Sequence, residues 1–172
     1  DDLKGVNMRV IPSEILQRMF EKYGANPVPI EFAETYNALQ QGVVDAQENP
    51  LETIRTHKFY EVQDHLTVTE HGYQFYMFVA NLDWFNGLSP ELQEILIEAE
   101  EEARVFARDL TREKSEQTLN EFPDLGLDVH ELPEEGREEF VELSMPLHEE
   151  FNDTPEKQEL LEKLYEELGI QQ

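Results

Sequence analysis

Apolar positions in the first half of the chain alternate between strand spacing and helix spacing. The run Asn7–Ile11 predicts a short strand, and a helix follows it with apolar residues three and four positions apart until Gly24. Two more strands and two more helices repeat this order: Val28–Ile30, Glu34–Gln41, Val44–Glu48 and Leu51–Val62. Short strands that alternate with helices predict a layered α/β domain.

Two further patterns refine this α/β region. Pro27 and Pro29 bracket the second strand, and because proline cannot donate to a strand ladder, we expect an edge position or a short strand. Farther on, Leu66–Thr69 and Tyr73–Ala80 have strand patterns. Both faces of the latter are mainly apolar, which is typical of a strand covered on both sides. We therefore expect residues 1–88 to form one three-layer α/β/α lobe.

The second half of the chain is mainly helical in pattern. Ser89 is a favourable N-cap and Pro90 suits the first helical position, so a helix is predicted to begin here and to continue to about Phe122. At about 1.5 Å per residue this helix is about 48 Å long, which is more than one small lobe needs. A strand and two helices follow: Leu127–Leu132, Glu134–Phe151 and Thr154–Leu168.

Charge is the feature of composition that changes this picture. The 172 residues carry 13 Lys and Arg against 39 Asp and Glu, for a net charge of −26. The excess is concentrated after residue 88, where 7 basic residues accompany 26 acidic ones. Such a surface repels phosphate backbones and anionic lipid headgroups, which argues against nucleic-acid and membrane-surface partners. Solubility explains this acidity, and adaptation to high salt, where screening suppresses self-repulsion, is the alternative explanation.

The sequence has no motif for catalysis or for a tightly bound cofactor. It has no cysteine, no two glycines separated by one residue and no Gly-Lys pair, so dinucleotide loops, nucleophile elbows and P-loops are absent. The five histidines lack the spacings of helical zinc and iron sites. Glu61 and Asp64 beside His65 could hold a cation, but a solvated helix end is the simpler interpretation. We expect no enzyme activity, no cofactor and no metal site.

The remaining candidate residues suit an anion. Arg9 lies at the end of the first strand, where α/β sheets present ligand-contacting residues, and its fork of donors matches a carboxylate. Asn49 can donate two hydrogen bonds to the same group, and Phe32 offers an apolar wall. On residue type alone, an ion pair with Asp45 or Glu48 is the more ordinary role of Arg9. Phe32 by itself is more often a core residue.

Five short sequence segments occur in order in the first half of the chain. They are Met8-Arg9-Val10, Gly24-Ala25-Asn26-Pro27-Val28-Pro29, the segment Phe32 to Asp45, Gln47-Glu48-Asn49-Pro50 and Lys58-Phe59-Tyr60-Glu61-Val62-Gln63. Their content and order resemble the solute-binding proteins of TRAP transporters, of the DctP type. The resemblance is dense over residues 2–110 and weaker afterwards.

This resemblance implies a function and a site. The ligand is expected to be an organic acid such as a C4-dicarboxylate, a sugar acid, sialic acid or a keto acid. Arg9 is implied to form the principal salt bridge to its carboxylate, Asn49 to support that group and Phe32 to line the pocket, and we place Gln47 in the same site. The protein is implied to be periplasmic and to deliver the acid to the membrane permease of the TRAP transporter.

Two positions differ from the family pattern, and a third distinguishes one of its branches. Ala33 stands where serine is common, so a helix N-cap is expected to be lost at a cost of about 1 kcal/mol. Ile11 stands where a proline is common, which changes the wall of the pocket. The keto-acid branch that uses a metal carries tryptophan in place of Asn49, so that branch is disfavoured.

Family members have two lobes, and this chain begins where their second lobe begins. We therefore expect a fragment without a signal peptide: a ligand-binding lobe at 1–88, a bridging helix at 89–122, and a strand with C-terminal helices at 123–172. An apolar patch exposed along the bridging helix should then drive self-association. An acidic interaction module without a small ligand is the alternative to a binding protein, and an enzyme acting on carboxylates is the third hypothesis.

Overall fold

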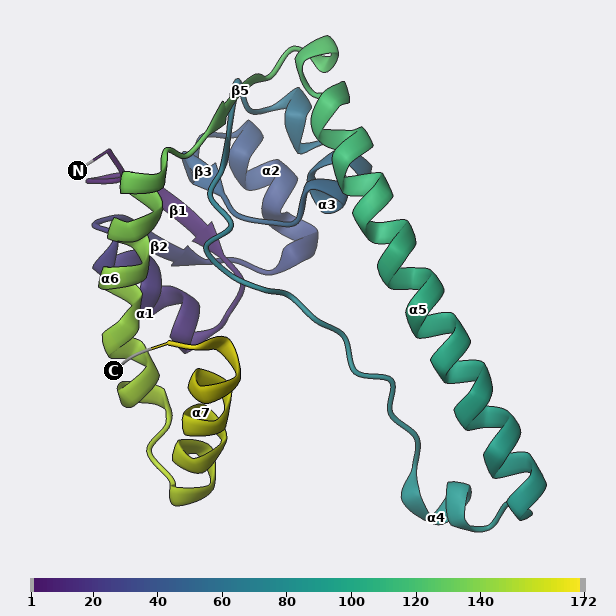
Figure 1. Ribbon diagram of the computed structural model, residues 1–172. Helices are drawn as coiled ribbons and strands as arrows, with labels where there is room; N and C mark the ends of the chain where they lie inside the picture. Colours follow the sequence, from purple (N-terminus) through teal and green to yellow (C-terminus); the bar gives the residue numbers. More distant parts are fainter. Residues whose placement is uncertain (1, 171–172) are drawn as a thin grey trace.

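Two small parallel sheets organise the chain in the computed structural model, which describes residues 2–170 (Figure 1). The first sheet has the strand order β2-β1-β3, so β2 lies at an edge, as its prolines predicted. The second sheet consists of β4 and β5 alone. The strands are β1 (Asn7–Val10), β2 (Asn26–Pro29), β3 (Ala46–Gln47), β4 (His65–Val68) and β5 (Asp128–Glu131).

Helices connect these strands and cover both faces of the first sheet. In chain order they are α1 (Glu14–Lys22), the 3-10 turn η1 (Phe32–Glu34), α2 (Thr35–Gln40), α3 (Leu51–Thr56), the 3-10 turn η2 (Phe59–Glu61), α4 (Leu82–Asn86), α5 (Pro90–Glu121), the 3-10 turn η3 (Pro123–Leu125), α6 (Glu134–Phe151) and α7 (Pro155–Leu168). The predicted α/β fold class is therefore confirmed, with a long helix and two C-terminal helices after the lobe.

The alternation of side chains along β1 separates two cores. Met8 and Val10 point toward α1 and α6, and join a cluster with Phe20, Tyr23, Ala25 and Leu147. Arg9 points to the opposite face. The core on that side is built from α2, α3, η2 and the second sheet, and contains Leu39, Val44, Ile54, Phe59, Leu66, Phe122 and Leu127. The only fully buried charged side chain among the described residues thus belongs to the strand between the two cores.

Local backbone conformation shortens two of the predicted helices. Lys58 adopts a left-handed conformation with φ of 58°, so the predicted helix Leu51–Val62 divides into α3 and the turn η2. The predicted helix Glu34–Gln41 is likewise preceded by η1, which starts at Phe32. Apolar spacing predicted helical character at both places but did not detect these breaks, because a change of helix type or a single left-handed residue leaves the spacing nearly intact.

The strand predicted at Tyr73–Ala80 is wrong. This segment forms no ladder with any strand in the described part of the chain, and Tyr73, Phe75, Tyr76 and Phe78 are 68–88% exposed. The reason is that an apolar pattern reports side-chain preference, whereas a strand also needs a neighbouring strand for its backbone hydrogen bonds. The short helix α4, which the pattern did not predict, follows this segment.

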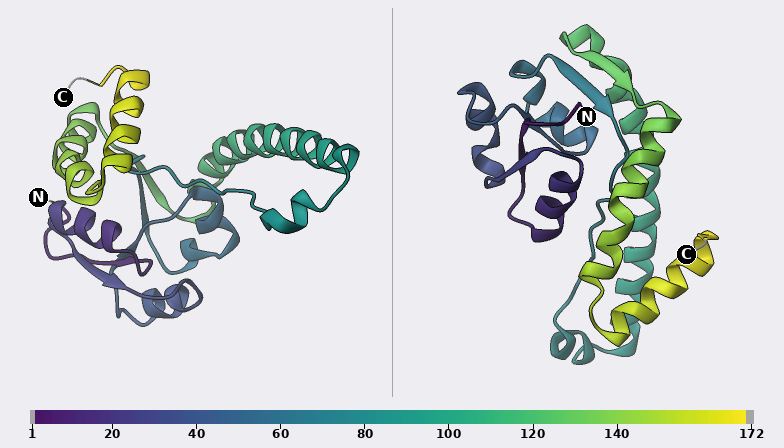
Figure 2. Two further views of the ribbon diagram at one scale, coloured as in Figure 1. Left: turned by 90° about the horizontal axis from the view of Figure 1, so that it is seen from below. Right: turned by 90° about the vertical axis from the view of Figure 1, so that its left-hand side faces the viewer.

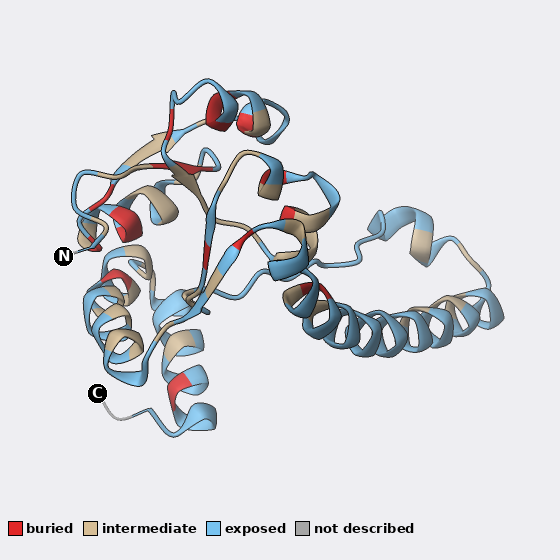
Figure 3. Ribbon diagram, turned by 90° about the horizontal axis from the view of Figure 1, so that it is seen from above, coloured by how far each residue is buried: buried red, intermediate tan, exposed pale blue. Residues whose placement is uncertain are grey.

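The long helix α5 begins and ends where the sequence predicted. The Ser89 hydroxyl accepts a hydrogen bond from the Leu92 N–H, so the expected cap is formed. Figures 1 and 2 show that α5 runs away from the lobe and meets it only near its C-terminal end, where Thr118 and Phe122 are buried. All residues from 101 to 114 are exposed, which Figure 3 shows as a nearly continuous pale-blue helix. No helix within residues 2–170 has both the length and the apolar character needed to cross a membrane.

Candidate carboxylate-binding site

Arg9 is completely buried near the C-terminal end of β1. Its Nε and Nη2 atoms donate to the carbonyl oxygen of Ile30, at 3.0 and 2.7 Å. These two bonds fix the plane of the guanidinium group. The third nitrogen, Nη1, is also buried but has no acceptor among residues 2–170. A buried donor without a partner is costly, so Arg9 presents a donor that an added acceptor would satisfy.

Phe32 lies against this guanidinium group. The Cζ atom of Arg9 is 5.8 Å from the centroid of the Phe32 ring, within the range of a cation–π contact. The ring also meets His57 and Phe59 edge to face, with centroids 4.7 and 6.1 Å away. Phe32 is nevertheless 37% exposed, so it is not a core residue. It forms a partly open apolar wall beside Arg9.

Two amide side chains lie on the neighbouring strand and the loop that follows it. Gln47 on β3 is in register with Arg9 on β1, so both side chains lie on the same face of the sheet. The Asn49 Nδ2 atom donates to Oε1 of Gln47 at 2.6 Å, and both residues are half-buried. The structure therefore brings the four predicted site residues together on one face. The oxygen of Gln47 accepts this bond, which leaves its Nε2 group to act as a donor toward a ligand.

The ordinary alternative, an ion pair for Arg9, is not formed within the described residues. Asp45 accepts a hydrogen bond from the backbone N–H of Asn7 at 2.9 Å. Glu48 instead has its carboxylate 3.7 Å from Nε2 of His71. Burial lowers the pKa of Arg9 below its usual value. The negative charges of Glu48 and Glu31 act in the opposite direction but do not outweigh burial. Arginine stays protonated in proteins, so the site holds a buried positive charge in a strongly acidic chain.

A hollow on α5 is a poor alternative for an anionic ligand. It is an open surface hollow of about 800 Å³, lined by Glu98, Glu101, Glu102, Val105, Phe106 and Asp109. Four of these six residues carry carboxylates, which repel an organic anion. The hollow also shares no residue with the group around Arg9. The chemistry of carboxylate recognition therefore belongs to the face of the sheet that carries Arg9.

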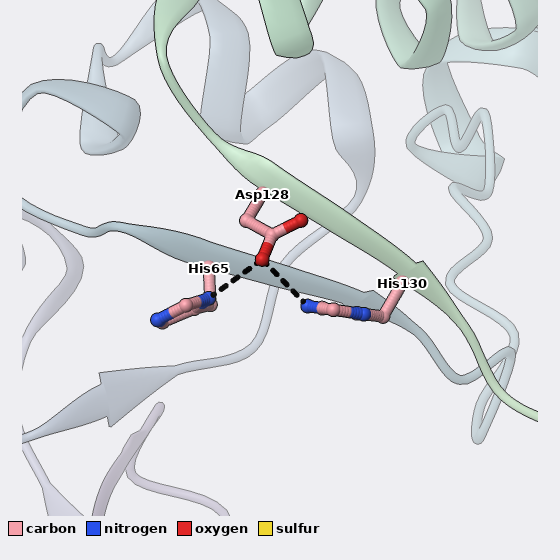
Figure 4. A group of neighbouring side chains, drawn as sticks. All are labelled: His65, Asp128 and His130. Atoms are coloured by element: carbon pink, nitrogen blue, oxygen red, sulfur yellow. Dashed lines mark ion pairs between the residues drawn. The ribbon is translucent and has the colours of Figure 1, made fainter.

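A second polar group was not expected from the sequence. Pairing of β4 with β5 brings together His65, Asp128 and His130, as Figure 4 shows. Only the alternate spacing of Asp128 and His130 was visible beforehand, because His65 lies far away in the sequence. Glu61, which seemed to be a neighbour of His65, instead contacts Lys58 at 3.2 Å and Tyr36 at 3.1 Å.

Comparisons with known proteins agree on one class. A model of the bacterial extracellular solute-binding proteins, family 7, named DctP, matches residues 1–154. The C4-dicarboxylate-binding periplasmic protein DctP of Rhodobacter capsulatus is 37% identical over 151 residues, which cover 87% of this chain and 45% of that protein. The 2,3-diketo-L-gulonate-binding periplasmic protein YiaO of Escherichia coli is 38% identical over 128 residues, which cover 74% and 39%.

Solved structures show the same relationship. A TRAP periplasmic solute-binding protein from Desulfovibrio salexigens with bound orotic acid superposes with a TM-score of 0.85 at 34% identity, covering 96% of this chain and 54% of that chain. The periplasmic ectoine-binding protein of the TeaABC TRAP transporter of Halomonas elongata gives 0.84 at 30% identity, covering 94% and 54%.

The fold and these matches place the chain among the TRAP-type solute-binding proteins, and the matched relatives are periplasmic transport proteins and not enzymes. The chain belongs to the DctP family, family 7 of the bacterial extracellular solute-binding proteins. It spans about half the length of the curated relatives it matches. The relatives bind C4-dicarboxylates, sugar acids and ectoine, according to their names.

Proposed function

We propose that this chain is part of the solute-binding component of a TRAP transporter and captures an organic acid through a salt bridge between Arg9 and a carboxylate. The observation that carries the proposal is the buried Nη1 atom of Arg9, which has no acceptor among the described residues and lies beside the partly open ring of Phe32. A carboxylate would accept a hydrogen bond from Nη1 and would also neutralise the positive charge of the guanidinium group. A neutral ligand would accept the hydrogen bond but leave the charge.

The hydrogen bonds of Arg9 support one direction of approach for the carboxylate. Because Nε and one proton of Nη2 are directed at Ile30, the free edge of the guanidinium group is the end formed by Nη1 and Nη2. The carboxylate binds there end-on, with two parallel charge-assisted hydrogen bonds. Gln47 and Asn49 supply further amide donors, and Phe32 contacts the carbon skeleton of the acid. The bond from Asn49 to Gln47 holds the two amides in place before the ligand binds.

The relatives support a ligand class and a location for this proposal. Solved structures at 30% and 35% identity hold succinate and galactonate, respectively, so a dicarboxylate or a sugar acid is the proposed ligand. The protein would act in the periplasm and deliver the acid to the TRAP permease. Within this proposal, residues 1–88 are the ligand-binding lobe, 89–122 the bridging helix, and 123–172 the strand and helices that pack back on the lobes.

A thermal-shift screen of the full-length protein tests the proposed function. We expect succinate, galactonate or a related acid to raise the melting temperature, since a ligand that binds only the folded state stabilises it by about 2.7 kcal/mol at a hundredfold excess over Kd. Sodium chloride at equal ionic strength and a neutral polyol are the controls. If no acid in a broad panel raises the melting temperature above these controls, the alternative of an acidic interaction module is favoured.

Asn49→Asp should weaken binding of the acid by about tenfold or more. The substitution replaces a donor with a negative charge facing the ligand carboxylate, and each tenfold loss corresponds to about 1.4 kcal/mol. Asn37→Asp is the matched control, because Asn37 is exposed on α2 and the charge change is identical. Isothermal titration of both variants measures the difference. Equal losses in the two variants would show that general charge repulsion, and not the site, is responsible.

The 172-residue chain by itself is expected to self-associate. Exposed apolar side chains lie along the extended segment before α4 and on α5: Tyr73, Phe75, Tyr76, Met77, Phe78, Val79 and Phe106. Burial of this surface is favourable, and salt should strengthen association because it screens the net charge of −26.

Light scattering after size exclusion measures this association. The double variant Phe75→Ser with Phe78→Ser should shift the chain toward monomer, whereas Gln74→Ser in the same segment should not. A chain that stays monomeric at high concentration and high salt would contradict the prediction.

A further inference from the structure

His65, Asp128 and His130 lie on one face of the two-stranded sheet. His65 is in register with Asp128 across the pair, and His130 follows Asp128 by two positions on β5, so all three side chains point the same way. Nε2 of His130 is 3.2 Å from Oδ2 of Asp128, and Nδ1 of His65 is 3.7 Å from the same oxygen. Figure 4 shows the carboxylate between the two imidazole rings.

The distances from the Asp128 oxygen to the two imidazole nitrogens are close to those between ligands of one metal ion. With bonds of about 2.1 Å, neighbouring ligands of a tetrahedral zinc ion are about 3.4 Å apart. The two nitrogens and the oxygen lie within 4.8 Å of one another, and all three residues are exposed, so small side-chain rotations bring them to that spacing. We propose that His65, Asp128 and His130 bind a divalent transition-metal ion such as Zn²⁺, with water completing the coordination.

The donor set selects the class of metal. Two imidazoles and one carboxylate suit Zn²⁺, Ni²⁺ or Cu²⁺, whereas Mg²⁺ and Ca²⁺ prefer oxygen ligands alone. The contacts could also be read as ordinary ion pairs between Asp128 and protonated histidines. At the observed side-chain exposures of 55–72%, however, such pairs contribute little, and they do not require both rings to converge on one oxygen.

The position of the site indicates what the metal does. The chain leaves the lobe after β4, passes through the extended segment, α4 and α5, and returns at β5 (Figure 1). A metal held by His65 and Asp128 therefore links the strand that precedes residues 69–127 to the strand that follows them. A two-stranded sheet is marginally stable by itself, so a link between its strands stabilises the connection of α5 to the lobe. This inference does not depend on the proposed ligand or on Arg9.

Zinc titration of the full-length protein, freed of metal with a chelator and carrying no polyhistidine tag, tests this inference. We expect one Zn²⁺ to bind and raise the melting temperature, and Mg²⁺ at the same concentration to have no such effect. Asp128→Asn and His130→Asn should each weaken zinc binding more than about tenfold, since even residues outside the ligand set typically affect metal affinity by 10- to 100-fold. Both residues are exposed, so the variants should fold, and their melting temperatures without metal verify this.

Glu131→Gln is the matched control. It removes one negative charge from the same strand, but Glu131 alternates to the other face of β5 and should leave zinc affinity unchanged. In NMR spectra, Zn²⁺ should shift the imidazole signals of His65 and His130 and leave those of His57 and His148 in place. Absence of saturable zinc binding, or binding that Asp128→Asn and His130→Asn do not weaken, would overturn the proposal in favour of scattered binding to surface carboxylates.

Discussion

Replacing Arg9 with alanine should strongly weaken binding of the organic acid by the full-length protein. Truncation of one partner of a buried, hydrogen-bonded charge pair costs about 2–5 kcal/mol, which corresponds to a loss of affinity of roughly 30-fold to several thousand-fold. Arg9→Lys keeps the positive charge but cannot donate end-on through two nitrogens, so we expect an intermediate loss. Isothermal titration with the acid found in the thermal-shift screen measures both values.

Arg18→Ala is the control for this experiment. Arg18 is an exposed arginine on α1 that contacts Glu21 and Glu150, so its removal changes the net charge equally without touching the site. Affinity within about twofold of wild type is expected for this variant. An Arg9→Ala protein that retained comparable affinity would contradict the proposed salt bridge.

The Arg9 variants should also lose stability. Nε and Nη2 hold the carbonyl of Ile30, and the side chain is completely buried, so alanine removes two hydrogen bonds and leaves a cavity. Binding must therefore be measured well below the melting temperature of each variant. Arg9→Lys fills most of the space, and it separates loss of the ligand contact from loss of folded protein.

Phe122→Ala should lower the free energy of unfolding by about 3–5 kcal/mol, the range typical of a buried phenylalanine. Phe122 is completely buried at the end of α5 and joins the core cluster that includes Ile54 and Leu127. Since a domain is stable by only about 5–15 kcal/mol, this change is a large fraction of the total. Urea titration followed by circular dichroism measures it.

Phe106→Ala, within α5 itself, is the control with the same residue change. Phe106 is 68% exposed, and its replacement in the 172-residue chain should change stability by about 0.5 kcal/mol or less. The comparison separates burial at the junction of α5 with the lobe from removal of a phenyl ring as such, which is the same in the two variants. Similar losses for both would mean that α5 does not anchor through its C-terminal end.

Local signals predicted the elements whose boundaries depend on neighbouring residues. The cap at Ser89 and the proline after it placed the start of α5, and Gly24, with φ of 90°, follows the end of α1. The prolines on either side of Val28 indicated an edge strand, which the sheet order confirms. These features succeed because each rests on backbone sterics or hydrogen bonding within a few positions along the chain.

The position of Arg9 and its three companions could be predicted, but their geometry could not. Residue type and family resemblance placed Arg9, Phe32, Asn49 and Gln47 in one site. Neither indicated that the carbonyl of Ile30 would occupy one edge of the guanidinium group and leave Nη1 as the unsatisfied donor. That detail depends on how β1 packs beside the turn after β2.

By itself, the sequence predicted most of the strands and helices in their order, the extent of α5 and the candidate site residues. Only the tertiary structure decided that Tyr73–Ala80 has no strand to pair with in the described chain, and that His65 meets Asp128 across 63 positions of sequence. The physical reason is that local preferences act over a few residues, whereas strand pairing and burial depend on which distant surfaces come into contact.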